Sequence, residues 1–231
     1  MRQIVLDTET TGLEPADGHR IIEIGCVELV NRKLTGNHYH QYIKPDREID
    51  EGAIEVHGIT NEFLEDKPRF EDIAEQFLEY IDGAELVIHN APFDVGFMDH
   101  EFKLWDPTKG KTADYCTILD TLVLARQMHP GQRNSLDALC KRYDIDNSHR
   151  ELHGALLDSE ILADVYLRMT GGQTNLTLGR QSSPSAETGE LPVRKISTNR
   201  PSLKVIKASE QELDAHHKKL QSLNDPLWEQ G

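Results

Sequence analysis

The sequence predicts an α/β fold in which helices flank a mixed β-sheet. Short apolar stretches with strand character come first along the chain, and strand and helix patterns then alternate. This order indicates a hairpin-rich start to the sheet followed by strands with helical connections. Hydrophobic residues make up 37% of the 231 residues, which is enough to build a core.

The period of the apolar residues places the elements along the chain. Continuous or alternating apolar runs predict strands over residues 3–6, 20–30, 34–43 and 85–88. Apolar spacings of three and four predict helices over residues 70–81 and about 91–103, 118–128, 135–142 and 154–169.

The composition changes after Gly172, which divides the chain into three predicted parts. Residues 1–172 contain 17 Lys and Arg against 33 Asp and Glu, a net charge of −16, and 13 of the 14 aromatic residues. Residues 173–231 have a net charge of +1 and a middle rich in Ser, Thr, Pro and Gly, which buries too little apolar area to offset the entropy of ordering. We expect a folded domain over 1–172, a flexible linker over 173–202 and a docking tail over 203–231.

The tail contains one predicted helix. Ser209 and Glu212 have the spacing of a capping box, and Leu213 and Leu220 then fall near one helix face. Together with Trp228, these leucines suggest a segment that docks on a partner protein. The alternative is a disordered tail in which the leucines are accidental.

Composition excludes several classes of protein. No apolar run approaches the roughly 20 residues of a membrane span, and Asp7 and Glu9 interrupt the apolar start that a signal peptide would need. The three cysteines, Cys26, Cys116 and Cys140, are odd in number and far apart. They fit neither a disulfide framework nor a zinc site, so we expect a reducing cytoplasm.

A first acidic motif directly follows the first predicted strand. Asp7 and Glu9 are two residues apart, so their carboxylates point to the same face of the strand. Adjacent anions repel one another unless a cation neutralises them, and Mg²⁺ or Mn²⁺ does this with oxygen ligands. The alternative is a strand that leaves the core into solvent, where acids are common.

A second acidic motif follows the strand at 85–88. Asn90 and Pro92 suit the N-cap and first turn of a helix, and Asp94 then lies in that turn. Open sheets place their ligands beside the C-terminal ends of such strands. The alternative is an acid that serves only the helix dipole.

A third motif opens the helix predicted over 154–169. Asp158 lies near the apolar stripe and should face the sheet, where a buried carboxylate needs a cation. Five helical residues turn His153 about 140° away from Asp158, so His153 must reach the site from the preceding loop. An imidazole at the rim suits a titrating base better than a metal ligand, although a lone histidine is more often a surface residue.

In this order the motifs resemble the histidine-bearing subclass of the DEDD family of 3′–5′ exonucleases. The resemblance is carried by Asp7-Thr8-Glu9, by residues 90–94 and by residues 153–158. Further stretches at residues 5–12, 21–25, 56–59, 133–140 and 169–173 resemble one branch of that family, the proofreading subunits of bacterial DNA polymerase III.

The resemblance implies a ribonuclease H-like core that hydrolyses nucleotides from DNA 3′ ends with two divalent metal ions, Mg²⁺ or Mn²⁺. It implies that Asp7 bridges the ions, that Glu9 and Asp158 complete one site, and that Asp94 holds the other. His153 would be the general base.

The resemblance also implies binding surfaces. The residues expected to contact the terminal nucleotide are Leu13, Val56, His57 and Phe93, of which Val56 and Phe93 could instead be core. A weak form of a sliding-clamp peptide is present at Gln173, Leu176 and Leu178. The tail residues expected to dock on the alpha polymerase subunit are Leu213, Leu220 and Trp228. A small theta-type subunit is a further expected partner, at a nucleoid-associated replisome.

Two other functions fit part of the sequence. A free-standing RNA exonuclease would share the motifs but would lack a linker with a terminal anchor. A non-catalytic adaptor between polymerase and clamp would keep the tail but would be free to lose at least one motif residue. The complete motif set and the tail together favour a proofreading exonuclease.

Overall fold

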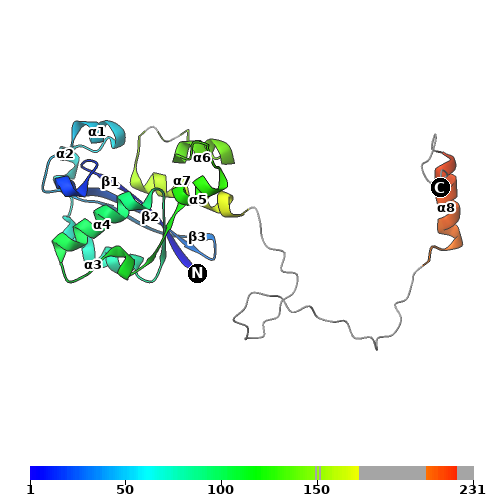
Figure 1. The fold of residues 1–231 in the computed structure, drawn as a ribbon, viewed down its shortest axis with the longest axis horizontal. Helices are drawn as coiled ribbons and strands as arrows, with labels where there is room; N and C mark the ends of the chain where they lie inside the picture. Colours follow the sequence, from blue (N-terminus) through cyan, green and yellow to red (C-terminus); the bar gives the residue numbers. More distant parts are fainter. Residues whose placement is uncertain (149, 151, 172–206, 223–231) are drawn as a thin grey trace, which may run out of the picture. The chain divides into compact units, whose positions relative to one another are not determined.

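The computed structural model describes residues 1–148, 150, 152–171 and 207–222 (Figure 1). The chain divides into two units, Met1–Leu176 and Thr177–Gly231, and each is described by itself. Among the described residues, no helix has the length and apolar character that crossing a membrane requires.

The first unit is built on a five-stranded mixed sheet with the order β3-β2-β1-β4-β5. The antiparallel strands are β1 (Arg2–Thr10), β2 (Ile21–Val30) and β3 (Lys33–Tyr42). β4 (Glu85–Ile88) pairs in parallel with β1, and β5 (Thr117–Asp120) pairs in parallel with β4. The predicted mixed sheet is confirmed.

Helices cover both faces of this sheet. Alternate residues of a strand point to opposite faces, so Ile4 and Leu6 join the core under α3 (Phe70–Ile81) and α4 (Ala91–Trp105). Val5 joins a second core with α7 (Ala155–Gly171). The helices that pack on α7 are α5 (Thr121–Met128) and α6 (Leu136–Tyr143).

Three elements differ from the sequence prediction. Residues 117–120 form β5 where the prediction began a helix at 118, because these residues complete the sheet beside β4. The Asp120 carboxylate then caps α5 by accepting from the backbone N–H groups of Leu122 and Val123. The short helices α1 (Glu51–His57) and α2 (Asn61–Leu64) were not predicted, because so few residues give no readable period. Two single-turn 3₁₀ helices, Pro15–Asp17 and Thr112–Asp114, complete the unit.

Helix α7 approaches the sheet unusually closely at Gly25 of β2. A Cβ atom at residue 25 would lie 2.1 Å from the Leu156 nitrogen and 2.2 Å from the Ala155 carbonyl carbon. The Ser159 hydroxyl donates to the Gly25 carbonyl oxygen at 2.8 Å. Since Gly25 pairs with Asp7 on β1, this contact also brings the start of α7 close to the first acidic motif.

The described part of the second unit contains α8 (Glu210–Gln221). The Glu212 carboxylate accepts from the Ser209 backbone N–H at 2.8 Å, and the Ser209 hydroxyl accepts from the Glu212 N–H at 3.4 Å. The predicted capping box is therefore confirmed. Leu213 is exposed on this helix, and Leu220 is partly exposed.

Candidate active site

The first acidic motif lies on the last residues of β1. Asp7 and Glu9 lie two and four residues after Val5 on the strand, so their side chains point to the same face as Val5. Both carboxylates therefore face the α7 side of the sheet. Thr8 points to the opposite side, where its backbone N–H and its hydroxyl donate to Asp94 Oδ1 at 3.1 and 2.7 Å. A single strand end thus presents two acids directly and holds a third.

Asp94 lies in the first turn of α4 and is only 3% exposed. Its hydrogen bonds to Thr8 show that it does more than complement the helix dipole. Asn90 stands at the N-cap position, as predicted, but its side chain does not cap the helix. Asn90 has a left-handed backbone conformation (φ 69°), which turns the chain from the end of β4 into the start of α4. Asn tolerates this conformation better than most residues.

Asp158 lies in the first turn of α7, is 3% exposed and faces the sheet. His153 lies in the loop before α7, where its side chain is 47% exposed. The backbone N–H of His153 donates to the Val56 carbonyl oxygen at 3.1 Å, which fixes the loop against α1. The histidine therefore reaches the acids from their rim, in the position that helical geometry predicted.

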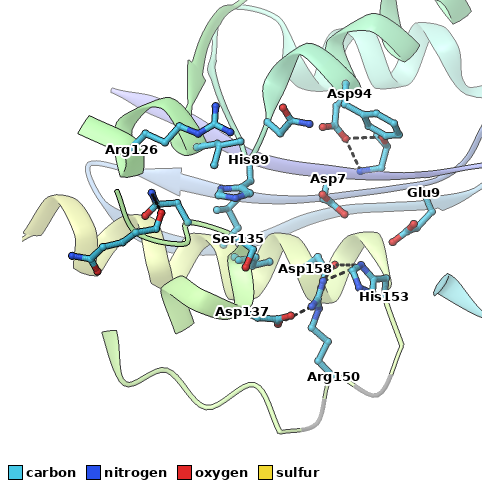
Figure 2. Close-up of a pocket in the computed structure, with 18 residues that line it drawn as sticks. Asp7, Glu9, His89, Asp94, Arg126, Ser135, Asp137, Arg150, His153 and Asp158 are labelled. Atoms are coloured by element: carbon cyan, nitrogen blue, oxygen red, sulfur yellow. Dashed lines mark hydrogen bonds and ion pairs between the residues drawn. The ribbon is translucent and has the colours of Figure 1, made fainter. Parts of the chain in front are cut away.

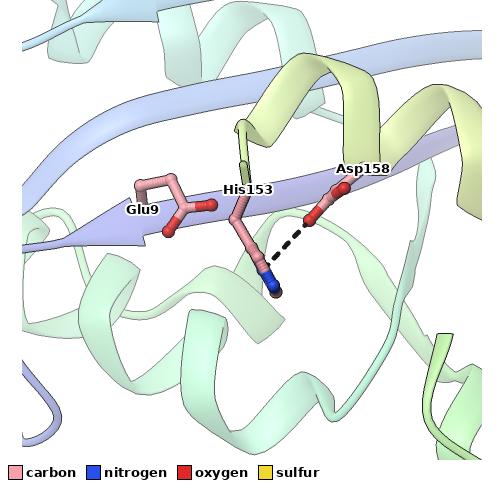
Figure 3. A group of neighbouring side chains, drawn as sticks. All are labelled: Glu9, His153 and Asp158. Carbon is pink, nitrogen blue, oxygen red and sulfur yellow. Dashed lines mark ion pairs between the residues drawn. The ribbon is translucent and has the colours of Figure 1, made fainter. Parts of the chain in front are cut away.

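The four acids and His153 line one cavity of about 710 Å³ (Figure 2). Ligand atoms of Glu9, His153 and Asp158 all lie within 4.8 Å of one another, close enough to hold one metal ion (Figure 3). This group includes His153, which was predicted as a base, and does not include Asp7. A donor set dominated by carboxylate oxygens fits a hard divalent cation.

The carboxyl groups of Asp7, Glu9 and Asp94 retain their protons more tightly than usual. Burial, followed by repulsion from Asp94, Glu9 and Asp158, holds the pKa of Asp7 well above its ordinary value. Burial and the nearby Glu23 raise the pKa of Glu9 to about 8, and burial raises that of Asp94 to about 7. The cluster therefore has more negative charge than its surroundings neutralise, which favours cation binding.

Arg150 is a pocket residue that the sequence analysis missed. Its Nε and Nη2 atoms donate to the two oxygens of Asp158 at 2.5 and 2.6 Å, and Nη1 donates to Asp137 at 2.9 Å. Nη2 also lies 3.0 Å from His153 Nδ1. A metal ion that takes an Asp158 oxygen would compete with this guanidinium. The only signal was an arginine three residues before His153, and arginine in a polar loop is too common to indicate a role.

The predicted nucleotide contacts line a second cavity of about 460 Å³. Leu13 and Val56 are 77% and 46% exposed, so Val56 is not a core residue. His57 is buried, and its Nδ1 accepts from the Ile59 N–H at 3.0 Å, which places the ring proton on Nε2. Within the described residues Nε2 has no partner at hydrogen-bond distance, but the atom is itself buried and the Thr10 backbone lies near the ring. Phe93 is half-buried and lines both cavities.

The remaining predicted residues belong to the tail and the linker. Leu213 and Leu220 belong to α8 in the second unit. The clamp motif, the linker at 173–202 and Trp228 lie outside the described residues.

This mixed sheet, with carboxylates gathered where β1 and β4 end, defines a class of protein, the exonucleases of ribonuclease H-like fold. The family described as "Exonuclease" matches residues 4–166. A solved structure of exonuclease X in complex with 5′ overhanging duplex DNA has a TM-score of 0.58 and 28% identity, and the match covers 73% of this chain and 91% of that one.

Two curated relatives match almost the full length of the chain. DNA polymerase III subunit epsilon of Salmonella typhimurium is 57% identical over 223 residues, covering 95% of this chain and 92% of the relative. The same subunit of Escherichia coli is 55% identical over the same lengths. The chain belongs to the exonuclease family, in the branch formed by the epsilon subunits of DNA polymerase III. The predicted fold, family and 3′–5′ exonuclease activity are thereby confirmed.

Proposed function

We propose that this chain removes mispaired nucleotides from the 3′ end of a growing DNA strand with the help of two Mg²⁺ or Mn²⁺ ions. One observation carries the proposal: four carboxylates and a histidine line a single cavity, which adjoins a second, largely apolar cavity. The acidic cavity suits a phosphate with its metal ions, and the apolar cavity suits a nucleobase.

The carboxylates are the proposed metal ligands. Asp7 would be shared by both ions, Glu9 and Asp158 would complete one site, and Asp94, held by Thr8, would support the other. Bound there, the ions supply charge that activates water and stabilises the attacking and leaving oxygens. The raised pKa values of Asp7, Glu9 and Asp94 support this assignment, since a cation relieves the repulsion that causes part of the shifts.

His153 is the proposed general base. In this structure Arg150 Nη2 lies 3.0 Å from His153 Nδ1 and can only donate to it. When Arg150 leaves this contact, the ring proton can move to Nδ1, which lies 3.5 Å from Asp158 Oδ2, and the Nε2 lone pair would then take a proton from the attacking water. The water oxygen bonds to the phosphorus, and the bond to the 3′ oxygen of the preceding nucleotide breaks. That oxygen takes a proton, so the products are a nucleoside monophosphate and a shortened strand with a new 3′ hydroxyl.

The second cavity is proposed to hold the terminal nucleotide. Leu13 and Val56 offer apolar contacts, Phe93 offers a ring face, and the His57 ring forms part of the wall. Stacking of this kind does not depend on base identity, as a proofreader requires. Selection of mismatches then comes from fraying, because an unpaired end costs less to move into the cavity.

The proposal predicts which substrate is preferred. With Mg²⁺, the full chain should release mononucleotides from 3′-mismatched duplex DNA about tenfold faster than from the matched duplex, because unpairing the mismatched end costs about 1.4 kcal/mol less. The measurement is product release from labelled primers, with a short RNA of the same sequence as comparison. Faster hydrolysis of the RNA would support the alternative of an RNA exonuclease.

Stability should depend on pH and metal together. The folded pKa of Glu9 is raised from 4.5 to about 8 and that of Asp94 from 3.8 to about 7, so the folded state binds more protons than the unfolded chain. In EDTA the melting temperature should therefore fall by several degrees as pH rises from about 4.5 to about 8. Mn²⁺ should raise it, and more at pH 8 than at pH 5.5. The Glu9→Gln variant should show a weaker pH dependence, and an unchanged dependence would contradict the assignment.

We also propose that the tail anchors the chain to the alpha polymerase subunit in the bacterial cytoplasm, at the replisome. The two relatives named as subunits of DNA polymerase III, and the exposed Leu213 on a capped helix, support an anchor. The clamp peptide at Gln173, Leu176 and Leu178 and a theta-type partner stay predictions. Co-purification with the polymerase subunit should succeed for the full chain and fail for residues 1–172, which should keep nuclease activity. Retention of the polymerase by the truncated chain would contradict docking through the tail.

A further inference from the structure

The acidic cavity extends to an end that the proposed reaction does not use. Arg126 of α5 lines this end together with Gln132 and Asn134, from the segment that joins α5 to α6. In Figure 2, Arg126 lies beyond His89, on the opposite side of Asp7 from Glu9.

The two arginines of the cavity differ in their partners. Arg150 is paired with Asp158 and Asp137. Arg126 makes no hydrogen bond or ion pair with any residue that the structure describes, and its side chain is exposed. Residues 1–172 have a net charge of −16, so an arginine that lines a cavity and has no partner among the described residues is available to bind an anionic ligand.

Hydrogen bonds of the Asn134 side chain hold the loop beside Arg126 in place. Asn134 is 7% exposed, and its Nδ2 donates to the carbonyl oxygens of His129 at 3.3 Å and Gln132 at 3.0 Å. Its Oδ1 accepts from Arg142 Nη1 at 3.1 Å. The Gln132 side chain has no hydrogen-bond partner among the described residues and so remains available, like Arg126. A fixed frame with two free polar side chains lowers the cost of binding a ligand.

The two cavities give the direction of a bound strand. They share Thr8, Glu9 and Phe93, so the acidic cluster lies between the apolar cavity and the Arg126 end. If the terminal nucleotide occupies the apolar cavity and its phosphate lies at the acids, the preceding nucleotide leaves toward Arg126. Each further nucleotide adds one negatively charged phosphate along this path.

We propose that Arg126 and Gln132 form a subsite for the phosphodiester group that precedes the scissile one, with the guanidinium donating to its non-bridging oxygens. This inference rests on the proposed function, because it takes the position of the scissile phosphate from it. The planar guanidinium can donate two N–H groups to one phosphate. Such a contact positions the strand without reading its sequence.

A pair of short substrates isolates this contact. The thymidine dinucleotide with a free 5′ hydroxyl has only the scissile phosphate, whereas the trinucleotide also has the preceding one. In the full-length chain with Mg²⁺, Arg126→Gln should lower kcat/KM for the trinucleotide about tenfold, mainly through KM, because the contact is the same before and during reaction. Activity on the dinucleotide should stay within about twofold of the original chain.

Two further variants complete the test. Arg126→Lys keeps the charge and should lose less kcat/KM on the trinucleotide than Arg126→Gln loses. The Arg126→Gln variant should also show a weaker salt dependence of KM for the trinucleotide, by an amount that corresponds to about one phosphate contact. Arg133→Gln removes an exposed arginine outside the cavity and should change neither substrate. Equal losses on both substrates, or no loss on the trinucleotide, would overturn the subsite. If the original chain hydrolysed neither substrate, the proposed function itself would fail.

Discussion

Replacing Asp7 by Asn should lower Mg²⁺-dependent nucleotide release about 10³-fold or more. The proposed site shares the Asp7 carboxylate between both ions, so the change removes a ligand from each and misplaces the attacking water. Steady-state release of mononucleotide from a single-stranded oligonucleotide measures the loss. Activity that survives the substitution would show that the acids of this cavity do not carry the reaction.

The same variant has a second readout that separates chemistry from folding. Because burial and neighbouring acids hold the pKa of Asp7 well above its ordinary value, the neutral amide should stabilise the metal-free fold at pH 8. Its melting temperature in EDTA should rise, while the increase on adding Mn²⁺ should shrink. Asp164→Asn is a matched control, because Asp164 is exposed on α7 outside the cavity. It should change neither quantity.

Replacing His153 by Ala should lower kcat about 10²- to 10⁴-fold, the usual contribution of a positioned general base. The loss should fall on kcat and leave Mn²⁺-induced stabilisation nearly intact, since the proposed ligands are carboxylates. Added imidazole should restore part of the rate, because the native side chain is 47% exposed and leaves an open site.

This prediction also decides between two roles for the histidine. Glu9, His153 and Asp158 lie close enough to share one ion, so His153 could be a metal ligand instead of a base. Loss of metal-induced stabilisation in His153→Ala, with no rescue by imidazole, would support the ligand role. His38→Ala, a change at an exposed position on β3, is the matched control and should leave rate and stability unchanged.

Local patterns predicted much of this protein because they reflect local physics. The two-residue period placed Asp7 and Glu9 on one face of a strand, and the helical period turned Asp158 toward the sheet. The same geometry placed His153 in the loop before α7. The strand at 117–120 was predicted as helix, because four residues show no period and only pairing with β4 makes them a strand.

The tertiary structure decided the contacts that sequence spacing does not contain. Thr8 holds Asp94 across 86 residues, and Gly25 admits α7 close to β1, because strand pairing and packing bring distant segments together. Arg150 is paired with Asp158, whereas Arg126 has no partner in the part of the chain that the structure describes, and both depend on which loops meet at one cavity. The sequence by itself therefore determined which face of their elements Asp7, Glu9 and Asp158 occupy and that His153 lies in the loop before α7. Only the fold decided their distances and partners, since these arise from contacts between residues far apart in the chain.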